Sequence, residues 1–356
     1  MEAKLRFKPI QLDLEPRPDW WKVRPQEIAD LCKSVKRGRA EVIAETPAGL
    51  PVYAVFYGDF SEPAPQTNWS AGSSSNTFKS YFARKPDEPQ TFLFVAGVHG
   101  AEAESVCAAV NLIQMLETGK DFRGKTYPEL LDLIGKYRFI IVPCANMDGR
   151  AISPDHLRKA SYEDFRRASQ GTWPDGELIG WRGSKEYFPL PLDRVSYPGG
   201  YPNSEGFNIM HDACPGHIRT AEARGILRLC ERWCVDGVLN GHSCEYGPAM
   251  IVPCILTYPA HAERGGELAT KINQAFYEAG LRPEPVKEPQ KAAGTGFNLN
   301  TMMTFASGAF AQTLECSVWY NFEFEQLIEP NFIALKIMLE DGLKKPFCDR
   351  EALVKR

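Results

Sequence analysis

Short apolar runs alternate along the chain with longer segments in which apolar residues recur at helical spacing. The run TFLFVAG (91–97) is almost continuously apolar, which is typical of a strand buried on both faces of a sheet. The segment 217–234 repeats its apolar residues every three or four positions, which indicates an amphipathic helix. Further strands are predicted at 138–146, 235–243, 249–257 and 309–319, and further helices at 25–38, 106–116, 261–280 and 324–343.

The first part of the chain predicts a β-hairpin. Segments 40–46 and 50–58 are rich in β-branched and aromatic residues, and the turn-forming sequence Pro-Ala-Gly separates them. Two such segments joined by a short turn containing glycine are typical of antiparallel strands.

Strands that alternate with helices predict an α/β fold, with a central mixed, largely parallel twisted sheet flanked by helices. No repeat or linker interrupts the pattern, so we expect a single domain over residues 1–356. Irregular excursions are predicted at about 59–80 and 151–207, the second with one helix near 161–169. An excursion of the second kind often lines or covers a functional site.

Composition narrows the class of protein. The chain has 356 residues, 44% hydrophobic and 24% charged, so it can bury a sizeable core. Its formal net charge of −4 excludes the basic surface of a nucleic-acid binder. No apolar run reaches the length of a membrane-spanning helix, and the first residues lack the apolar core of a signal peptide. We therefore expect a cytoplasmic protein without nucleic-acid or membrane partners, while no apolar surface stripe predicts an oligomeric state.

Titratable side chains stand at or near the ends of several predicted strands. His99 and Glu102 follow the first buried strand, His242 stands near the end of a later one, and Glu315 lies within the last. Ligands of open α/β sheets bind at the carboxyl ends of the strands, so these four residues mark a candidate site. The chain has only six histidines, which limits the imidazoles available to any such site.

The chemistry of these side chains suits zinc. Two histidines and one glutamate form a recognised catalytic ligand set that leaves a fourth position open, and His99, Glu102 and His242 match it. Bound zinc lowers the pKa of water from 15.7 towards about 7, and Glu315 would then act as the general base. Taken alone, the pair His99 and Glu102 has a simpler interpretation, in which Glu102 begins a helix and interacts with its dipole.

Four segments, taken in order, resemble the zinc carboxypeptidase family of carboxypeptidase A-like metallopeptidases. The resemblance implies a carboxypeptidase A-like fold and one Zn²⁺ per chain, held by His99, Glu102 and His242. It also implies Glu315 as the base and Arg158 as the residue that stabilises the oxyanion. The implied activity is zinc-dependent hydrolysis of a peptide or amide bond. The four segments are VAGVHGAEAE (95–104), VPCANMDGR (142–150), LNGHS (239–243) and AQTLEC (311–316).

The substrate-binding part of the site departs from the family pattern. Met210 and His211 stand where the family has an Asn-Arg pair for the substrate's terminal carboxylate, and an imidazole is a weaker, pH-dependent substitute for a guanidinium. We name Asn208, His211 and Arg150 as candidate substrate-binding residues. The expected substrate is a peptide or an acylated amino acid.

Other functions remain open at this point. A zinc-dependent deacylase of N-acyl amino acids would use the same fold and ligands. Ser243, in the sequence Gly-His-Ser-Cys-Glu, resembles a serine-hydrolase nucleophile, although that motif needs a small residue where Glu245 stands. A non-catalytic binding module would have no use for all three ligands together with Glu315.

Overall fold

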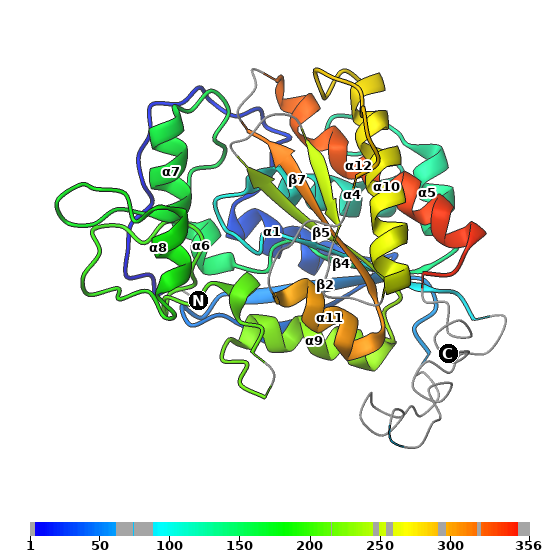
Figure 1. The fold of residues 1–356 in the computed structure, drawn as a ribbon, viewed down its shortest axis with the longest axis horizontal. Helices are drawn as coiled ribbons and strands as arrows, with labels where there is room; N and C mark the ends of the chain where they lie inside the picture. The colour runs from blue at the N-terminus through cyan, green and yellow to red at the C-terminus, as the bar shows by residue number, and fades with distance from the viewer. Residues whose placement is uncertain are drawn as a thin grey trace.

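Seven strands form one mixed sheet in the order β1-β2-β4-β3-β5-β7-β6 (Figure 1). The structure is a computed structural model that describes residues 4–61, 74, 88–214, 216–244, 249–253, 259–290, 297–318 and 322–347. Neighbours at the centre of the sheet (β4-β3-β5-β7) are parallel, whereas β1–β2, β2–β4 and β7–β6 are antiparallel. The predicted α/β fold with a mixed sheet is confirmed. The strands are β1 (Arg39–Glu45), β2 (Pro51–Tyr57), β3 (Thr91–Ala96), β4 (Arg138–Val142), β5 (Gly237–Cys244), β6 (Met250–Pro253) and β7 (Phe310–Ser317).

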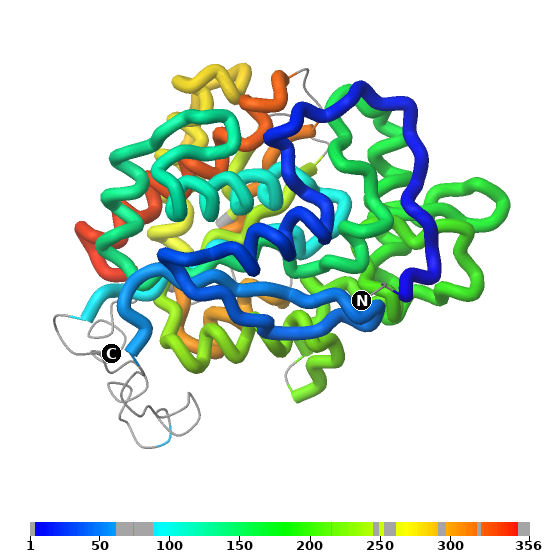
Figure 2. Tube along the Cα trace, turned by 180° about the vertical axis from the view of Figure 1, so that it is seen from behind, coloured from blue at the N-terminus to red at the C-terminus, as the bar shows by residue number. Residues whose placement is uncertain are grey.

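Helices cover both faces of the sheet (Figures 1 and 2). Helices α1, α4, α5 and α12 lie on one face, and α9 and α11 lie on the other, while α10 packs beside the edge strand β6. None of the described helices combines the length and the apolar character that crossing a bilayer requires. The helices are α1 (Pro25–Ser34), α4 (Ala103–Thr118), α5 (Pro128–Ile134), α6 (Met147–Ile152), α7 (Tyr162–Gln170), α8 (Gly180–Glu186), the 3₁₀ turn η1 (Ile209–His211), α9 (Ala221–Trp233), α10 (Pro259–Glu278), α11 (Leu299–Ser307) and α12 (Phe324–Lys344).

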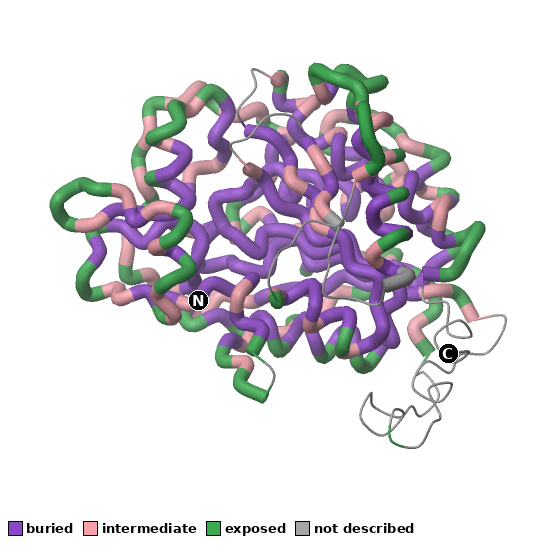
Figure 3. The backbone as a smooth tube through the Cα atoms, viewed as in Figure 1, coloured by how far each residue is buried: buried purple, intermediate pink, exposed green. Residues whose placement is uncertain are grey.

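The central strands are buried along their whole length, as their apolar sequences predict. Every residue of β3 and β4 is buried, because helices exclude water from both faces of the parallel part of the sheet. Figure 3 shows this buried centre beneath more exposed helices. One apolar cluster connects Trp21 near the start of the described chain with Phe347 at its end.

Helix ends follow the local sequence. The Thr220 side chain accepts a hydrogen bond from the backbone N–H of Ala223 and caps the start of α9, while Gly119 ends α4 in the left-handed conformation. Both residues suit these positions, because threonine satisfies a free N–H of the first turn and glycine adopts a positive φ without strain.

The excursion at 151–207 folds into α7, α8 and connecting turns beside the carboxyl ends of β3, β5 and β7 (Figure 1). Its predicted helix near 161–169 is confirmed as α7. Most of the excursion predicted at 59–80 lies outside the described residues, as does the end of the strand predicted at 249–257.

Candidate active site

Three neighbouring parallel strands carry the candidate residues to one edge of the sheet. His99 follows β3, and Glu102 directly precedes the first turn of α4. His242 on β5 stands in register with Glu315 on β7, so both side chains project from the same face of the sheet. Residues far apart in sequence therefore meet because their strands are parallel neighbours.

The turn between His99 and Glu102 packs closely against the start of α6. A Cβ atom added to Gly100 would lie 2.1 Å from the backbone nitrogen of Arg150 and 2.1 Å from the carbonyl carbon of Gly149. The Gly100 N–H also donates to the Gly200 carbonyl, at 2.7 Å. Only glycine fits here, and its close packing fixes the direction of the two neighbouring ligands.

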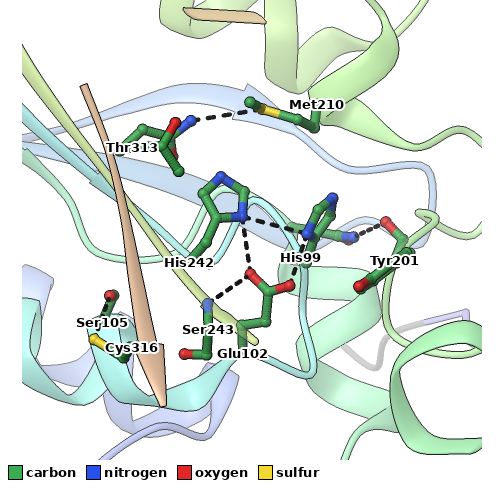
Figure 4. A network of polar contacts seen from close by, with 12 residues as sticks. His99, Glu102, Ser105, Tyr201, Met210, His242, Ser243, Thr313 and Cys316 are labelled. Carbon is green, nitrogen blue, oxygen red and sulfur yellow. Dashed lines mark hydrogen bonds and ion pairs between the residues drawn. The ribbon is translucent and has the colours of Figure 1, made fainter. Parts of the chain in front are cut away.

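The two imidazoles present the same nitrogen to the Glu102 carboxylate (Figure 4). His99 Nδ1 lies 2.8 Å from Glu102 Oε1, and His242 Nδ1 lies 2.9 Å from Glu102 Oε2. All three side chains are buried. Burial alone would raise the pKa of Glu102, but the two imidazoles hold it well below its usual value. Burial alone would lower the pKa of His242, but the negative charge of Glu102 and its hydrogen bond outweigh burial and raise the pKa above its usual value.

This group fits a divalent metal ion. The candidate ligand atoms of His99, Glu102 and His242 all lie within 4.8 Å of one another, and no other group of three His, Cys, Asp or Glu residues in the described ranges does so. Two imidazole nitrogens and a carboxylate form the ligand set of a catalytic zinc site.

Two neighbours hold the His99 ring in place. The Asn208 side-chain oxygen accepts from the Met210 N–H at 3.0 Å and lies 3.2 Å from His99 Nε2. An amide oxygen can only accept, so Nε2 carries the proton and Nδ1 keeps its lone pair for a metal. The Tyr201 ring stacks on the His99 ring with centroids 4.1 Å apart. Asn208, named above as a candidate substrate contact, thus lies against a candidate metal ligand.

Ser243 is hydrogen-bonded to two glutamates. Its N–H donates to Glu102 Oε2 at 3.2 Å, and its hydroxyl donates to Glu104 Oε2 at 2.6 Å. Ser243 also lies within β5 rather than at a turn between strand and helix. A hydroxyl that donates to a buried carboxylate lacks the histidine base of a serine nucleophile.

Glu315 lies beside the metal-ligand group with its side chain half-buried. Its negative charge contributes to the raised pKa of His242, as their shared register on adjacent strands requires. A half-buried carboxylate at this position keeps access to solvent beside the two imidazoles.

The two candidate arginines are both buried and have hydrogen-bond partners. The Arg158 guanidinium is buried, donates to Glu15 and to the Phe322 carbonyl, and pairs with Glu323 at 3.0 Å. Arg150 is also buried, and its Nη2 donates to the Pro154 carbonyl.

His211 faces the candidate site. Burial, followed by the positive charges of Lys185, His99 and His242, lowers the pKa of His211 to about 3. The imidazole is therefore neutral at pH 7. The structure brings His211 and Asn208 to the metal-ligand group, whereas the described partners of Arg158 and Arg150 belong to other parts of the molecule.

Sequence reasoning missed the residues that the 151–207 excursion contributes. Tyr201 contacts His99, Trp181 packs edge-on against Tyr201 with centroids 5.8 Å apart, and Lys185 lies over the Trp181 ring. The irregular sequence predicted that this segment lines a site, but no periodicity indicated which of its side chains face it.

Comparison with known proteins gives one family match. The zinc carboxypeptidase family model matches residues 40–173, a stretch that includes His99 and Glu102 but neither His242 nor Glu315. No curated protein matches the chain.

Solved structures share the fold at low sequence identity. A metallo-carboxypeptidase from Burkholderia cenocepacia matches with a TM-score of 0.57 and 15% identity, over 90% of this chain and 69% of that chain. One from Pseudomonas aeruginosa, in complex with (2-guanidinoethylmercapto)succinic acid, matches with a TM-score of 0.55 and 14% identity, over 90% and 68%. Bovine thrombin-activatable fibrinolysis inhibitor, in complex with tick carboxypeptidase inhibitor, matches with a TM-score of 0.51 and 12% identity, over 91% and 99%.

Proposed function

The resemblance of this chain to the zinc carboxypeptidases is confirmed, in sequence over residues 40–173 and in fold over most of its length, and on this premise we propose that it is a zinc-dependent hydrolase of a peptide or amide bond. One observation carries the proposal. His99 Nδ1 and His242 Nδ1 converge on the two oxygens of Glu102, and Glu315 stands in register with His242 on the next strand.

Each candidate residue would have a separate role in the proposed reaction. His99, Glu102 and His242 would hold the metal, which when bound supplies a Lewis acid and lowers the pKa of a water molecule. The Glu315 carboxylate would accept a proton from the attacking water and pass it to the departing amine. The role of Arg158 in stabilising the oxyanion stays a prediction. To reach a substrate, its guanidinium would first have to leave its contacts with Glu15 and Glu323.

The experiment combines metal analysis with a substrate screen. Purified protein should contain about one zinc per chain, and it should hydrolyse at least one amide from a panel of carboxypeptidase, N-acyl amino acid and cell-wall peptide substrates. A chelator should abolish that activity and zinc should restore it. Metal-free protein isolated without exposure to chelator would contradict the proposal, as would activity that a chelator does not affect.

Glu315→Gln separates metal binding from catalysis. The variant should keep its zinc and lose roughly 10²- to 10⁴-fold in rate, the usual contribution of a general base. Glu177→Gln, at an exposed position of the excursion, makes the same chemical change away from the site and should keep the wild-type rate. A Glu315→Gln variant with the wild-type rate would show that the assigned base is wrong.

A deacylase of N-acyl amino acids is the second candidate. It is favoured by the neutral imidazole of His211 where the family has a permanently charged arginine. The screen distinguishes the two activities, because a deacylase would hydrolyse N-acyl amino acids faster than peptides. Labelling of Ser243 by a fluorophosphonate, together with insensitivity to chelator, would instead indicate a serine hydrolase.

A further inference from the structure

A lysine of α8 lies over an aromatic ring next to the candidate site. Lys185 Nζ lies 3.3 Å from the centroid of the Trp181 ring, and the two residues stand one helical turn apart on α8. A tryptophan ring attracts an ammonium through its quadrupole. The lysine is therefore positioned by a residue of its own helix.

Aromatic contacts join this lysine to a proposed metal ligand. Trp181 packs edge-on against Tyr201, with centroids 5.8 Å apart and an interplanar angle of 80°. Tyr201 stacks on His99, with centroids 4.1 Å apart, and Figure 4 shows this tyrosine beside the His99 ring. The chain of rings fixes α8 relative to the metal-ligand group, because each ring rests on the next.

The ammonium of Lys185 interacts electrostatically with two residues of the candidate site, Glu315 and His211. The Glu315 carboxylate attracts the ammonium, and the ammonium in turn helps to keep His211 neutral. Within the part of the chain that the structure describes, Lys185 forms no ion pair with a carboxylate, and its side chain is exposed. A ligand can therefore reach a positive charge here.

The other cationic candidates have partners or are inaccessible. Arg158 pairs with Glu15 and Glu323, and Arg150 is buried. His211 carries no charge at pH 7, since its pKa lies at about 3. Of the cations and imidazoles considered for substrate binding, Lys185 alone combines charge with access.

We propose that Lys185 determines specificity at this site by binding a carboxylate of the substrate, with the exposed part of the Trp181 side chain contacting an apolar group beside it. The inference rests on the proposed hydrolase function and assigns recognition of the substrate's carboxylate to Lys185 on α8, away from Met210 and His211 where the family has its Asn-Arg pair. A charge-assisted hydrogen bond from an ammonium to a carboxylate is about twice as strong as a neutral one. Neutral His211 cannot provide it.

Binding of two matched probes to the zinc-loaded protein tests this inference without any turnover. The probes are 3-phenylpropanoate, which has the carboxylate and the ring, and 3-phenylpropanol, which has only the ring. By calorimetry, Lys185→Met should weaken 3-phenylpropanoate binding by about 10- to 100-fold and leave 3-phenylpropanol within about twofold. Lys185→Arg should retain most of the affinity for the carboxylate. Arg182→Met, which removes one exposed charge from the same helix, should bind both probes as the wild type does.

Each outcome decides the question. Equal 3-phenylpropanoate affinity in Lys185→Met and the wild type overturns the inference, and so does an equal loss in Lys185→Met and Arg182→Met, because a long-range charge effect would then suffice. The amide screen is read separately. If Lys185→Met loses carboxylate binding but the wild type hydrolyses no amide, the proposed function fails and the carboxylate site stands. If the wild type hydrolyses an amide but Lys185→Met binds 3-phenylpropanoate as the wild type does, the role of Lys185 is rejected and the hydrolase function stands.

Discussion

At the scale of single residues, the contact with Asn208 favours the tautomer of His99 that has its hydrogen on Nε2. The sequence identified both histidines of the proposed metal site, because each stands at or near a strand end of the predicted sheet. The contact between His99 Nε2 and Asn208 Oδ1 could not be predicted from the sequence, since the two residues are 109 positions apart and no local pattern relates them. Supporting contacts of this kind orient a ligand and tune its affinity for the metal.

Asn208→Ala should therefore weaken zinc binding by about 10- to 100-fold, the usual cost of losing a residue that supports a ligating histidine. Competition with a chromogenic chelator measures the affinity. Asn208→Asp is the matched control, because it keeps an acceptor oxygen for both His99 and the Met210 N–H. Unchanged affinity in the alanine variant would mean that Asn208 does not orient His99.

The carboxylate preference assigned to Lys185 should depend on pH. Partial loss of hydration around the ammonium, opposed by the charge of Glu315, lowers the pKa of Lys185 to about 8 although the side chain as a whole is exposed. The side chain is charged below this pH and neutral above it, so the preference for 3-phenylpropanoate should be full at pH 6 and should decline through pH 8. His211, facing Lys185 from η1, stays neutral across this range.

Calorimetry between pH 6 and pH 9.5 measures the decline, and Lys185→Arg provides the comparison because a guanidinium stays charged throughout. The same fall in both proteins would assign the titration to another group.

At the scale of secondary-structure elements, the sequence predicted which segments form strands better than how the strands pair. The apolar runs that became β3, β4, β5 and β7 were found because burial on both faces leaves a continuous signature. The antiparallel pairing of β2 with β4 has no such signature, because pairing depends on which strands the connections bring together. Within the described part of the chain, the short strand β6 joins the sheet through β7 alone.

The packing of the turn after β3 against α6 makes Gly100 sensitive to substitution. In Gly100→Ala, the new methyl group would meet backbone atoms at 2.1 Å, and backbone cannot move aside as a flexible side chain can. We expect a loss of about 1–3 kcal/mol or more in the free energy of unfolding, together with weaker zinc binding.

Urea unfolding of the metal-free protein measures this loss. Gly135→Ala is the control, since its new methyl group would meet nothing nearer than 3.6 Å and its backbone is already helical. That variant should gain about 0.4–1 kcal/mol. An unchanged midpoint in Gly100→Ala would show that the turn can shift without cost.

At the scale of the whole molecule, a metal bound at this site would link distant parts of the chain. His99 and Glu102 lie in the first third of the sequence and His242 in the last, so the unfolded chain does not hold the three ligands together. A metal that binds only the folded protein stabilises it by mass action.

Zinc at about 100 times its Kd should add about 2.7 kcal/mol to the free energy of unfolding, seen as a higher melting temperature. His242→Ala is the control, because it removes one ligand but keeps the ten cysteines that could bind zinc nonspecifically. If zinc raises the melting temperature of both proteins equally, the stabilisation comes from another site.

The strand order also has a consequence for synthesis on the ribosome. Among the described strands β6 pairs with β7 alone, yet β6 leaves the ribosome first, so it has no partner strand until residues 310–317 emerge. The same late strand carries Glu315. A nascent chain therefore contains all three proposed metal ligands before the proposed base, and we expect ribosome-arrested chains ending after α10 to retain zinc less firmly than the full chain and to hydrolyse nothing. Vectorial growth would thus delay hydrolytic activity until the sheet is nearly closed.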